Sequence, residues 1–127
     1  MGTQHIHFVD TTLRDGSHAV RHSYTVDQVS KIAAGLDRSG VSFIELSHGD
    51  GLGGSSYAYG FSAVDEFELL KAAASVMKNS TLTALLLPGI GTIENLKKAQ
   101  SLGVKAVRVA SHVTEADVTE QFIREAK

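Results

Sequence analysis

The sequence contains no cysteine, and it has no long apolar run. Without cysteine there can be no disulfide and no thiolate metal site. The longest apolar segment, residues 82–87 with Thr83 inside it, is far shorter than the roughly 20 residues that span a bilayer. The N-terminal residues also lack the basic-then-apolar pattern of a secretion signal. We therefore expect a cytoplasmic protein that is not embedded in a membrane.

An excess of positive charge is missing as well. Twelve basic and 14 acidic residues are mixed along the chain and give a formal net charge of −2. No cationic face for nucleic acid or anionic lipid is visible in such a pattern, so neither is expected as a partner. A length of 127 residues with 43% hydrophobic content is ordinary for one globular domain.

Strand-like and helix-like segments alternate four times, with a period of roughly 35 residues. The strands are expected at 5–10, 41–46, 81–87 and 104–110, and the helices are expected to begin at caps at Thr25, Ser62, Thr92 and Thr114. This alternation predicts an α/β fold with a parallel sheet and right-handed crossovers. Two architectures fit: an open doubly wound sheet, or four βα units of a (β/α)₈ TIM barrel, whose usual length is about 250 residues.

A glycine pattern follows the second expected strand. Gly49-x-Gly51-x-x-Gly54 matches the dinucleotide-binding fingerprint by letter, but that fingerprint requires its third glycine to open a helix. Here residues 55–61 intervene before the next cap at Ser62. The pattern therefore favours a flexible loop over residues 48–60 that covers a substrate.

Two histidines, His5 and His7, stand two apart on the first expected strand and would share one face of it. Such a pair can bind a metal. It lies near the beginning of the strand, however, whereas sites in parallel α/β folds form at the carboxyl ends. We therefore do not expect a metal at this pair.

A polar cluster follows the carboxyl end of the first strand, where Arg14, Asp15 and His18 occur within five residues. Glu45 ends the second strand and His48 follows it. A carboxylate with imidazoles suits a divalent metal, arginine stabilises an oxyanion, and histidine carries protons near neutral pH. The alternative is a surface Arg14–Asp15 ion pair beside a solvated His18, and the spacing alone leaves both interpretations open.

The segment Asp10-Thr11-Thr12-Leu13-Arg14-Asp15-Gly16 resembles the signature of metal-dependent lyases and aldolases related to hydroxymethylglutaryl-CoA lyase. Glu45 matches the acidic position that completes the Asp-Arg-Glu set of this superfamily. Within it, the chain is similar to the 4-hydroxy-2-oxovalerate aldolases in four motifs that occur in the same order: 16–19, 47–56, 86–92 and 114–117. The resemblance covers the whole chain.

The resemblance implies a class II retro-aldol cleavage of 4-hydroxy-2-oxoacids to pyruvate and a short aldehyde such as acetaldehyde, with Mn²⁺ as cofactor. In this reading Asp15 is a metal ligand and the metal is a Lewis acid. Arg14 stabilises the developing negative charge and contacts the substrate. His18 accepts the proton of the C4 hydroxyl group as a general base.

Further roles come from the same resemblance. Glu45 would hold Arg14 in place as part of the catalytic set. His48 and Leu87 would belong to the substrate-binding site, with Leu87 near the alkyl end of the substrate. An acylating acetaldehyde dehydrogenase is the implied protein partner, and degradation of aromatic hydrocarbons is the implied metabolic setting.

The chain departs from the family in extent. It ends after four βα units, so residues 1–127 are expected to be the N-terminal half of a TIM-barrel domain, without the later units and the C-terminal helical domain. The family's later His-x-His metal pair and its C-terminal tyrosine have no counterpart after Ala110. His112 follows the fourth strand and would either approach the pocket or be an ordinary loop histidine. The rival hypothesis is a non-catalytic half-barrel that associates with itself and retains an anion or metal site.

Overall fold

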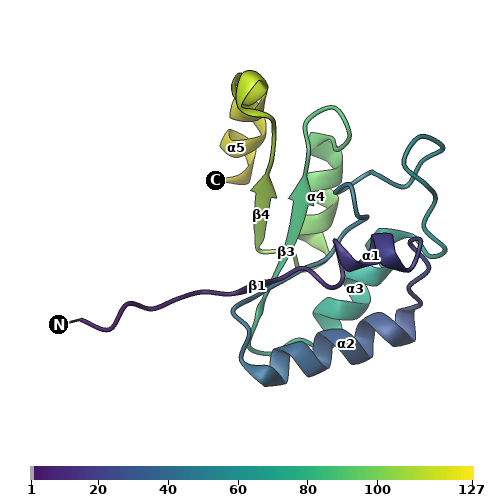
Figure 1. Cartoon of the computed structure of the whole chain (residues 1–127), viewed down its shortest axis with the longest axis vertical. Coiled ribbons are helices and arrows are strands. Elements are labelled where there is room, and N and C mark those ends of the chain that lie inside the picture. The colour runs from purple at the N-terminus through teal and green to yellow at the C-terminus, as the bar shows by residue number, and fades with distance from the viewer. Residues whose placement is uncertain (1) are drawn as a thin grey trace.

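The computed structural model describes residues 2–127, which form one four-stranded parallel sheet with helices between its strands (Figure 1). The elements are β1 (Val9–Asp10), α1 (Gly16–Ala19), α2 (Val26–Ser39), β2 (Phe43–Glu45), α3 (Glu66–Val76), β3 (Thr81–Leu86), α4 (Ile93–Ser101), β4 (Ala106–Val109), the 3₁₀ helix η1 (Val113–Thr119) and α5 (Glu120–Ala126).

The order of the strands in the sheet distinguishes the two expected architectures. The strands lie side by side in sequence order, β1-β2-β3-β4, and every neighbouring pair is parallel. A doubly wound sheet reverses its strand order at a switch point, and this sheet has no reversal. The parallel four-stranded sheet with alternating helices is therefore consistent with the N-terminal half of a TIM barrel.

The pleat of the strands separates two faces of the sheet. Ile44 of β2 and Leu82, Ala84 and Leu86 of β3 pack into the hydrophobic core shared with the helices. Because side chains alternate along a strand, Glu45 points to the opposite face. Arg108 reaches that face from β4, since its neighbours Val107 and Val109 pack against the core. This second face corresponds to the interior of a barrel.

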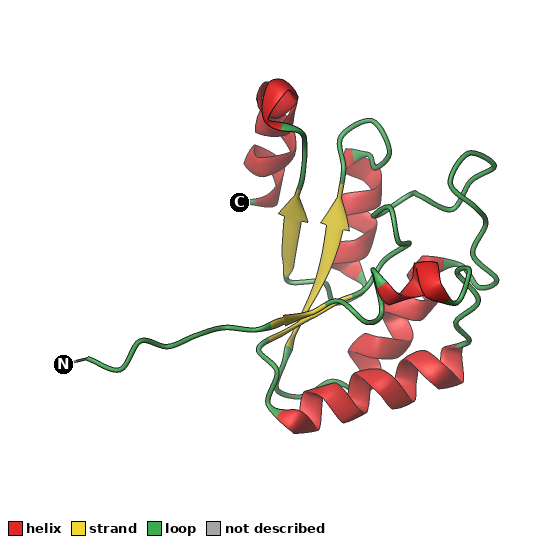
Figure 2. Cartoon of the chain, in the orientation of Figure 1, coloured by secondary structure: helices red, strands yellow, loops and turns green. Residues whose placement is uncertain are grey.

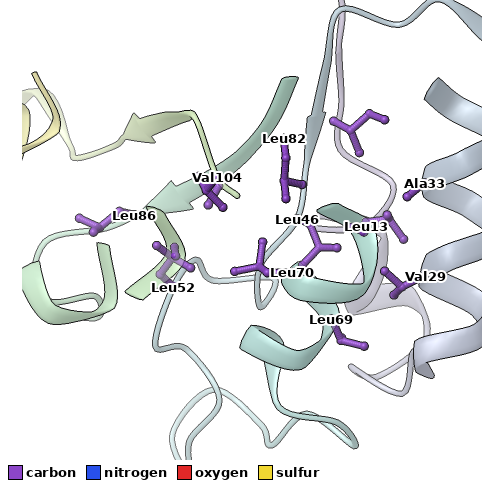
Figure 3. Packing of buried hydrophobic residues seen from close by; sticks show 14 of the residues in the cluster. Leu13, Val29, Ala33, Leu46, Leu52, Leu69, Leu70, Leu82, Leu86 and Val104 are labelled. Carbon is purple, nitrogen blue, oxygen red and sulfur yellow. The ribbon is translucent and has the colours of Figure 1, made fainter. Parts of the chain in front are cut away.

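The core lies between the sheet and the helices. Leu13, Leu46 and Leu70 are at most 2% exposed, and they meet between β2, α3 and the turn after β1 (Figure 3). Burying each such leucine side chain contributes roughly 1.5–3 kcal/mol. Leu13 is thereby anchored in the core, which fixes the backbone position of the residue that follows it, Arg14.

Two helices begin where the sequence predicts. Thr25 and Thr92 each accept a hydrogen bond from the backbone three residues later, and the side chains of Gln28 and Asn95 bond back, so that both helices carry a capping box. Gly40 ends α2 with φ of 87°, a left-handed conformation that glycine adopts without strain.

The first strand is shorter than predicted. Residues 2–8 form no regular secondary structure, the N-terminal end of this segment extends away from the helices, and only Val9 and Asp10 pair with β2 (Figure 1). The ladder starts there because β2 itself begins at Phe43, opposite Val9. The alternation of residues 5–10 therefore reflects β propensity, but residues 5–8 have no partner strand with which to form a ladder.

The prediction for two further helices was wrong at their starts. Helix α3 is capped by Asp65, whose Oδ1 accepts from the backbone N–H of Phe67 at 2.7 Å, whereas the backbone N–H of Ser62 is bonded to Ser55 within the preceding loop. The last helix is divided into η1 and α5, with non-helical dihedrals at Glu115. The short helix α1 was not predicted. Within residues 2–127 no helix is long and apolar enough to cross a membrane.

The carboxyl ends of the strands carry the long connections. The turn and helix α1 after β1 lie beside the loop between β2 and α3, which spans residues 46–65 and is drawn as the longest internal loop (Figure 2). Residues from both segments form the candidate active site.

Candidate active site

The turn after β1 places the first three polar residues. The backbone N–H groups of Arg14, Asp15 and Gly16 all donate to the carbonyl oxygen of Thr11, at 3.0, 2.7 and 3.2 Å. The chain then enters α1, where Ser17 is buried and donates from its hydroxyl group to the carbonyl oxygen of Arg14 at 2.5 Å. His18, the next residue, remains exposed.

Arg14 is held by three acceptors. Its Nε donates to Glu45 Oε1 at 2.8 Å, and its Nη1 donates to Asp15 Oδ1 at 3.1 Å and to the carbonyl oxygen of Gly49 at 3.3 Å. The side chain of Arg14 is 15% exposed, so it is largely but not completely buried. The structure thus brings together Arg14, Asp15 and Glu45, as the sequence predicted.

Glu45 is completely buried and has a second cationic partner that the sequence analysis missed. Arg108 on β4 donates from Nε to Glu45 Oε2 at 2.6 Å and from Nη2 to Oε1 at 2.9 Å. Burial alone would raise the pKa of Glu45, but the hydrogen bonds from Arg108 and Arg14 outweigh it and lower the pKa. The signal available in the sequence was one arginine at an inward position of an otherwise apolar strand.

Asp15 was the predicted metal ligand, and its surroundings test that role. Its side chain is 65% exposed, and one oxygen is engaged by Arg14. An accessible carboxylate is a suitable ligand for a hard divalent cation, yet one carboxylate falls short of the several ligands of a stable site. Asp15 therefore fits a metal as one member of a larger donor set.

A different group of side chains in residues 2–127 meets the geometric requirement for a metal site. One ligand atom each from His18, His22 and Asp50 lies within 4.8 Å of the other two. The rings of His18 and His22 make an edge-to-face contact at 5.1 Å. A possible His/Asp metal site thus exists at the same corner, and Asp15 is not one of its ligands.

His22 reaches this group through an uncommon backbone conformation. Its φ is 56° and that of Arg21 is 51°, which places two successive non-glycine residues in the left-handed region. Each such residue costs on the order of 1 kcal/mol or more, and such strain concentrates at functional sites. Burial, reinforced by the neighbouring His48 and His18, lowers the pKa of His22. The four-residue spacing from His18 was the available signal for His22.

His48 was predicted to bind substrate, and the structure places its ring inside the loop that follows β2. The ring is 1% exposed. Its Nδ1 accepts from the backbone N–H of Asp50 at 3.1 Å, and its Nε2 lies 2.9 Å from the carbonyl oxygen of Gly60, to which it donates. Both nitrogens are therefore occupied by the loop, and burial lowers the pKa of His48. His48 organises the loop, and its ring stacks on that of His22 at 3.8 Å.

Glu66 anchors the same loop from α3 and was also missed. Its Oε2 accepts from the backbone N–H of His48 at 2.8 Å, and its Oε1 accepts from that of Gly53 at 2.6 Å. Burial raises the pKa of this carboxyl group, and the two hydrogen bonds oppose the shift. An acidic residue in the first turn of a helix is so common that the sequence offered no specific signal for this contact.

The glycine pattern is explained by close packing within the loop. A Cβ atom on Gly49 would lie 2.5 Å from Cε1 and Nε2 of His18, and one on Gly54 would collide with the ring of His48. Neither glycine opens a helix. The prediction of a loop over residues 48–60, instead of a dinucleotide fingerprint, agrees with this geometry.

Leu87 and the remaining histidines lie at different distances from the polar corner. Leu87 follows β3 at its carboxyl end and is half-buried beside Gly51, on which a Cβ would lie 3.3 Å from Leu87 Cδ1. His112 is exposed at the start of η1. His5 and His7 lie in the extended N-terminal segment, where His7 Nδ1 is 3.3 Å from Ser42 Oγ. Leu87 thus lies against the loop after β2, whereas His5 and His7 lie outside the candidate active site.

A hollow of about 310 Å³ lies elsewhere, between the end of α4, the start of β4 and the end of α5. Its lining includes Leu96, Val104, Val107 and Ala126. These residues lie at the amino-terminal end of β4. Since sites in parallel α/β folds form at the carboxyl ends, this hollow is separate from the candidate active site.

Known proteins are similar to this chain over nearly its whole length. The HMGL-like family matches residues 5–127. A protein of Moorella thermoacetica named 4-hydroxy-2-oxovalerate aldolase is 61% identical over 127 residues, which is 100% of this chain and 38% of the relative. Proteins with the same name from Carboxydothermus hydrogenoformans and Thermus thermophilus are 57% and 56% identical, over 96% and 94% of this chain and 36% and 34% of their own lengths. The chain thus spans little more than a third of these relatives, and it belongs to the HMGL-like family.

Proposed function

We propose that this chain forms the first part of the active site of a 4-hydroxy-2-oxovalerate aldolase. The observation that carries the proposal is the fixed position of Arg14, which is held by buried Glu45 and directly followed by Asp15 and the exposed His18. The relatives named above support the choice of reaction. Residues 1–127 would be the partial barrel domain of that enzyme, with Met1 outside the described residues.

The reaction is a retro-aldol cleavage in which the C3–C4 bond of the substrate breaks. His18 would accept the proton of the C4 hydroxyl group, so that the C4 carbon leaves as the carbonyl of acetaldehyde. The electron pair of the broken bond remains on the three-carbon product, the enolate of pyruvate, which becomes pyruvate when C3 is protonated. An exposed imidazole at this corner is suited to the first proton transfer.

Arg14 would stabilise the negative charge that develops on the enolate. The two positive charges of Arg14 and Arg108 are balanced by the negative charges of Glu45 and Asp15, so Arg14 would act through N–H groups that are held in a fixed position, and not through an excess of charge. Donors that are already positioned stabilise a transition state without further reorganisation. Glu45 would therefore act by orienting Arg14, without touching the substrate.

A divalent metal ion, which we propose to be Mn²⁺, would supply Lewis-acid chemistry at the 2-oxo oxygen of the substrate. Asp15 would hold it with one carboxylate oxygen. The additional ligands would come from parts of the aldolase outside this chain, because one carboxylate is insufficient. This assignment is supported by the exposure of Asp15 and its position beside Arg14.

The loop between β2 and α3 would enclose the substrate, with His48 and Glu66 fixing its shape and Leu87 beside the alkyl end. The predicted role of His48 in substrate binding would then be exerted through the loop backbone. The released aldehyde would pass to an acylating acetaldehyde dehydrogenase, as in the degradation of aromatic hydrocarbons, in the cytoplasm.

The proposal is tested by joining this chain to the remaining part of the Moorella thermoacetica aldolase and measuring pyruvate formation from 4-hydroxy-2-oxovalerate with Mn²⁺. We expect turnover in this full-length protein. The His18→Asn variant should lose at least about 100-fold in kcat, the scale of general-base catalysis, whereas His112→Asn should retain activity. Normal turnover in His18→Asn would refute the assigned base, and a folded fusion without turnover would refute the function.

A second candidate function rests on the edges of the sheet. Within the described residues β1 and β4 each pair with one neighbour only, and unpaired parallel edges favour association. A non-catalytic half-barrel would use these edges to form a stable dimer of the 127-residue chain. Light scattering decides: a folded monomer would exclude this function, and a dimer that lacks aldolase activity even in the full-length fusion would favour it.

A further inference from the structure

The three side chains His18, His22 and Asp50 form a group that the proposed aldol chemistry uses only in part. Each of the three offers a ligand atom within 4.8 Å of the others. Tetrahedral Zn²⁺ with ligand bonds near 2.0–2.2 Å separates neighbouring ligand atoms by about 3.4 Å. Side-chain rotations that close the longest gap by roughly 1.4 Å would therefore complete the site.

The hydrogen bonding of the corner determines which imidazoles are available as ligands. His48 is excluded, since its two nitrogens are bonded to Asp50 N–H and to the Gly60 carbonyl oxygen. Within the described part of the chain, neither ring nitrogen of His18 or His22 has a hydrogen-bond partner, and His22 Nε2 is a buried atom without any. The two rings thus retain the lone pairs that a metal requires.

The negative charge of Asp50 also favours the binding of a cation. Its Oδ2 lies 3.6 Å from Nδ1 of His48, but that nitrogen accepts a hydrogen bond from the backbone N–H of Asp50 and therefore carries no proton of its own. Among residues 2–127 no lysine or arginine forms an ion pair with Asp50. The carboxylate is half-buried between imidazoles without a compensating cation.

We propose that His18, His22 and Asp50 form a binding site for Zn²⁺ or a similar transition-metal ion, separate from the Asp15 site. Two imidazoles and one carboxylate are a zinc ligand set that leaves the fourth position open. Mn²⁺ binds such a site more weakly, because affinity for nitrogen-containing sites rises from Mn²⁺ towards Cu²⁺ and remains higher for Zn²⁺. Asp15, a lone exposed carboxylate, suits the harder ion instead.

The consequence for catalysis rests on the proposed function. A metal ion bound to His18 occupies the nitrogen that would accept the C4 hydroxyl proton. Zn²⁺ therefore inhibits the aldolase even when Mn²⁺ is present in excess, and the inhibition requires His22 and Asp50 although neither residue takes part in the cleavage.

Binding is tested first on the full-length fusion in which His5 and His7 are replaced by asparagine, so that the N-terminal pair adds no site. Zn²⁺ affinity is measured by competition with a chromophoric indicator, after removal of bound metals with a chelator. Asp50→Asn and His22→Asn are each expected to weaken this site at least about tenfold, and His112→Asn to leave it unchanged. Circular dichroism verifies that each variant is folded. If His22→Asn does not fold, Asp50→Asn still provides the test, because it preserves the shape of the side chain.

Two results would overturn the proposal: equal Zn²⁺ affinity in the background protein and in Asp50→Asn, or equal affinity of this site for Mn²⁺ and Zn²⁺. Activity provides the second measurement. With Mn²⁺ present, Asp50→Asn should need at least about tenfold more Zn²⁺ for half-inhibition, matching its lost affinity. Site-specific binding without inhibition would refute the involvement of His18. A fusion that lacks activity altogether refutes the aldolase function and leaves the binding result intact.

Discussion

Glu45 and Arg108 are 63 residues apart in the sequence, and their side chains form two charge-assisted hydrogen bonds of 2.6 and 2.9 Å. The contact crosses the inner face of the sheet from β2 to β4, passing over β3. Because the same carboxylate also accepts from Arg14, the position of Arg14 after β1 depends on a residue on β4, three strands away. The geometry of the site therefore depends on the pairing of β2, β3 and β4.

Replacing Arg108 by methionine should therefore impair catalysis from a distance. Glu45 would keep only Arg14 as a cation and could rotate with it, and small misplacements of catalytic groups are costly. We expect kcat of the full-length aldolase to fall between about 10- and 100-fold, with a smaller change in KM. Steady-state kinetics of pyruvate formation measures both values.

The control for this variant is Lys105→Met, which removes a charge from an exposed position just before the same strand. It should leave kcat unchanged. Arg108→Lys should recover activity only in part, because an ammonium group cannot make the two-pronged contact of the guanidinium group. Equal kcat values for Arg108→Met and the unmodified aldolase would show that Arg108 does not position Arg14.

Glu45→Ala should be among the most destabilising single substitutions. It leaves two guanidinium groups without their shared partner in a place where Glu45 is fully buried. Because Arg108 is half exposed and Arg14 keeps Asp15, the loss of unfolding free energy should stay below the roughly 3–5 kcal/mol of a fully buried pair, at about 2 kcal/mol, and Glu45→Gln, which keeps an acceptor, should cost less. Urea denaturation of the two variants provides the comparison, and a loss under about 1 kcal/mol in Glu45→Ala would contradict the network.

Gly49→Ala should disturb His18 while sparing the fold. The added Cβ would lie 2.5 Å from the imidazole ring, which belongs to an exposed and movable side chain. The ring should turn away, and kcat should drop by at least about tenfold, part of what general-base catalysis contributes. The matched control is Gly35→Ala inside α2, where the nearest atom is 4.0 Å away and stability should rise by about 0.5–1 kcal/mol. Unchanged kcat in Gly49→Ala would mean that His18 does not need its observed position.

Local patterns were sufficient to predict most of the fold and the meeting of three polar residues at one corner of the sheet. The helix caps at Thr25 and Thr92 and the apolar β3 are properties of short segments, and the structure confirms them. Arg14, Asp15 and Glu45 meet because the carboxyl ends of neighbouring parallel strands meet, which follows from topology alone.

Long-range contacts could not be predicted in the same way. Arg108 reaches Glu45 because the strand register pairs Arg108 with Leu85 of β3. His48 turns inward because Gly54 leaves room for its ring. The left-handed turn at Arg21 and His22 contains no glycine that would indicate it in the sequence. These features depend on packing between segments, which a single sequence does not reveal.

Asp37 provides a test of how the fold responds to acid. It lies in the last turn of α2, where the helix dipole disfavours an anion, yet its carboxylate accepts backbone N–H groups of Lys78, Asn79 and Ser80 at 2.6–2.9 Å. These bonds, foremost that from Ser80, outweigh the effect of burial and lower the pKa of Asp37 far below its usual 3.8.

A carboxyl group whose pKa is lower in the folded than in the unfolded protein adds stability that is complete above the unfolded value. The contribution of Asp37 should thus be constant at neutral pH and decline as the pH falls below about 5, through 3.8 and beyond. Asp37→Asn should cost on the order of 2 kcal/mol at pH 7 and much less at pH 3. The surface variant Asp27→Asn should cost less than about 1 kcal/mol at pH 7, since Asp27 is exposed and paired only with Lys31. Denaturation curves at both pH values decide, because a cost of Asp37→Asn that is independent of pH would show that the carboxylate charge does not hold the loop between α3 and β3.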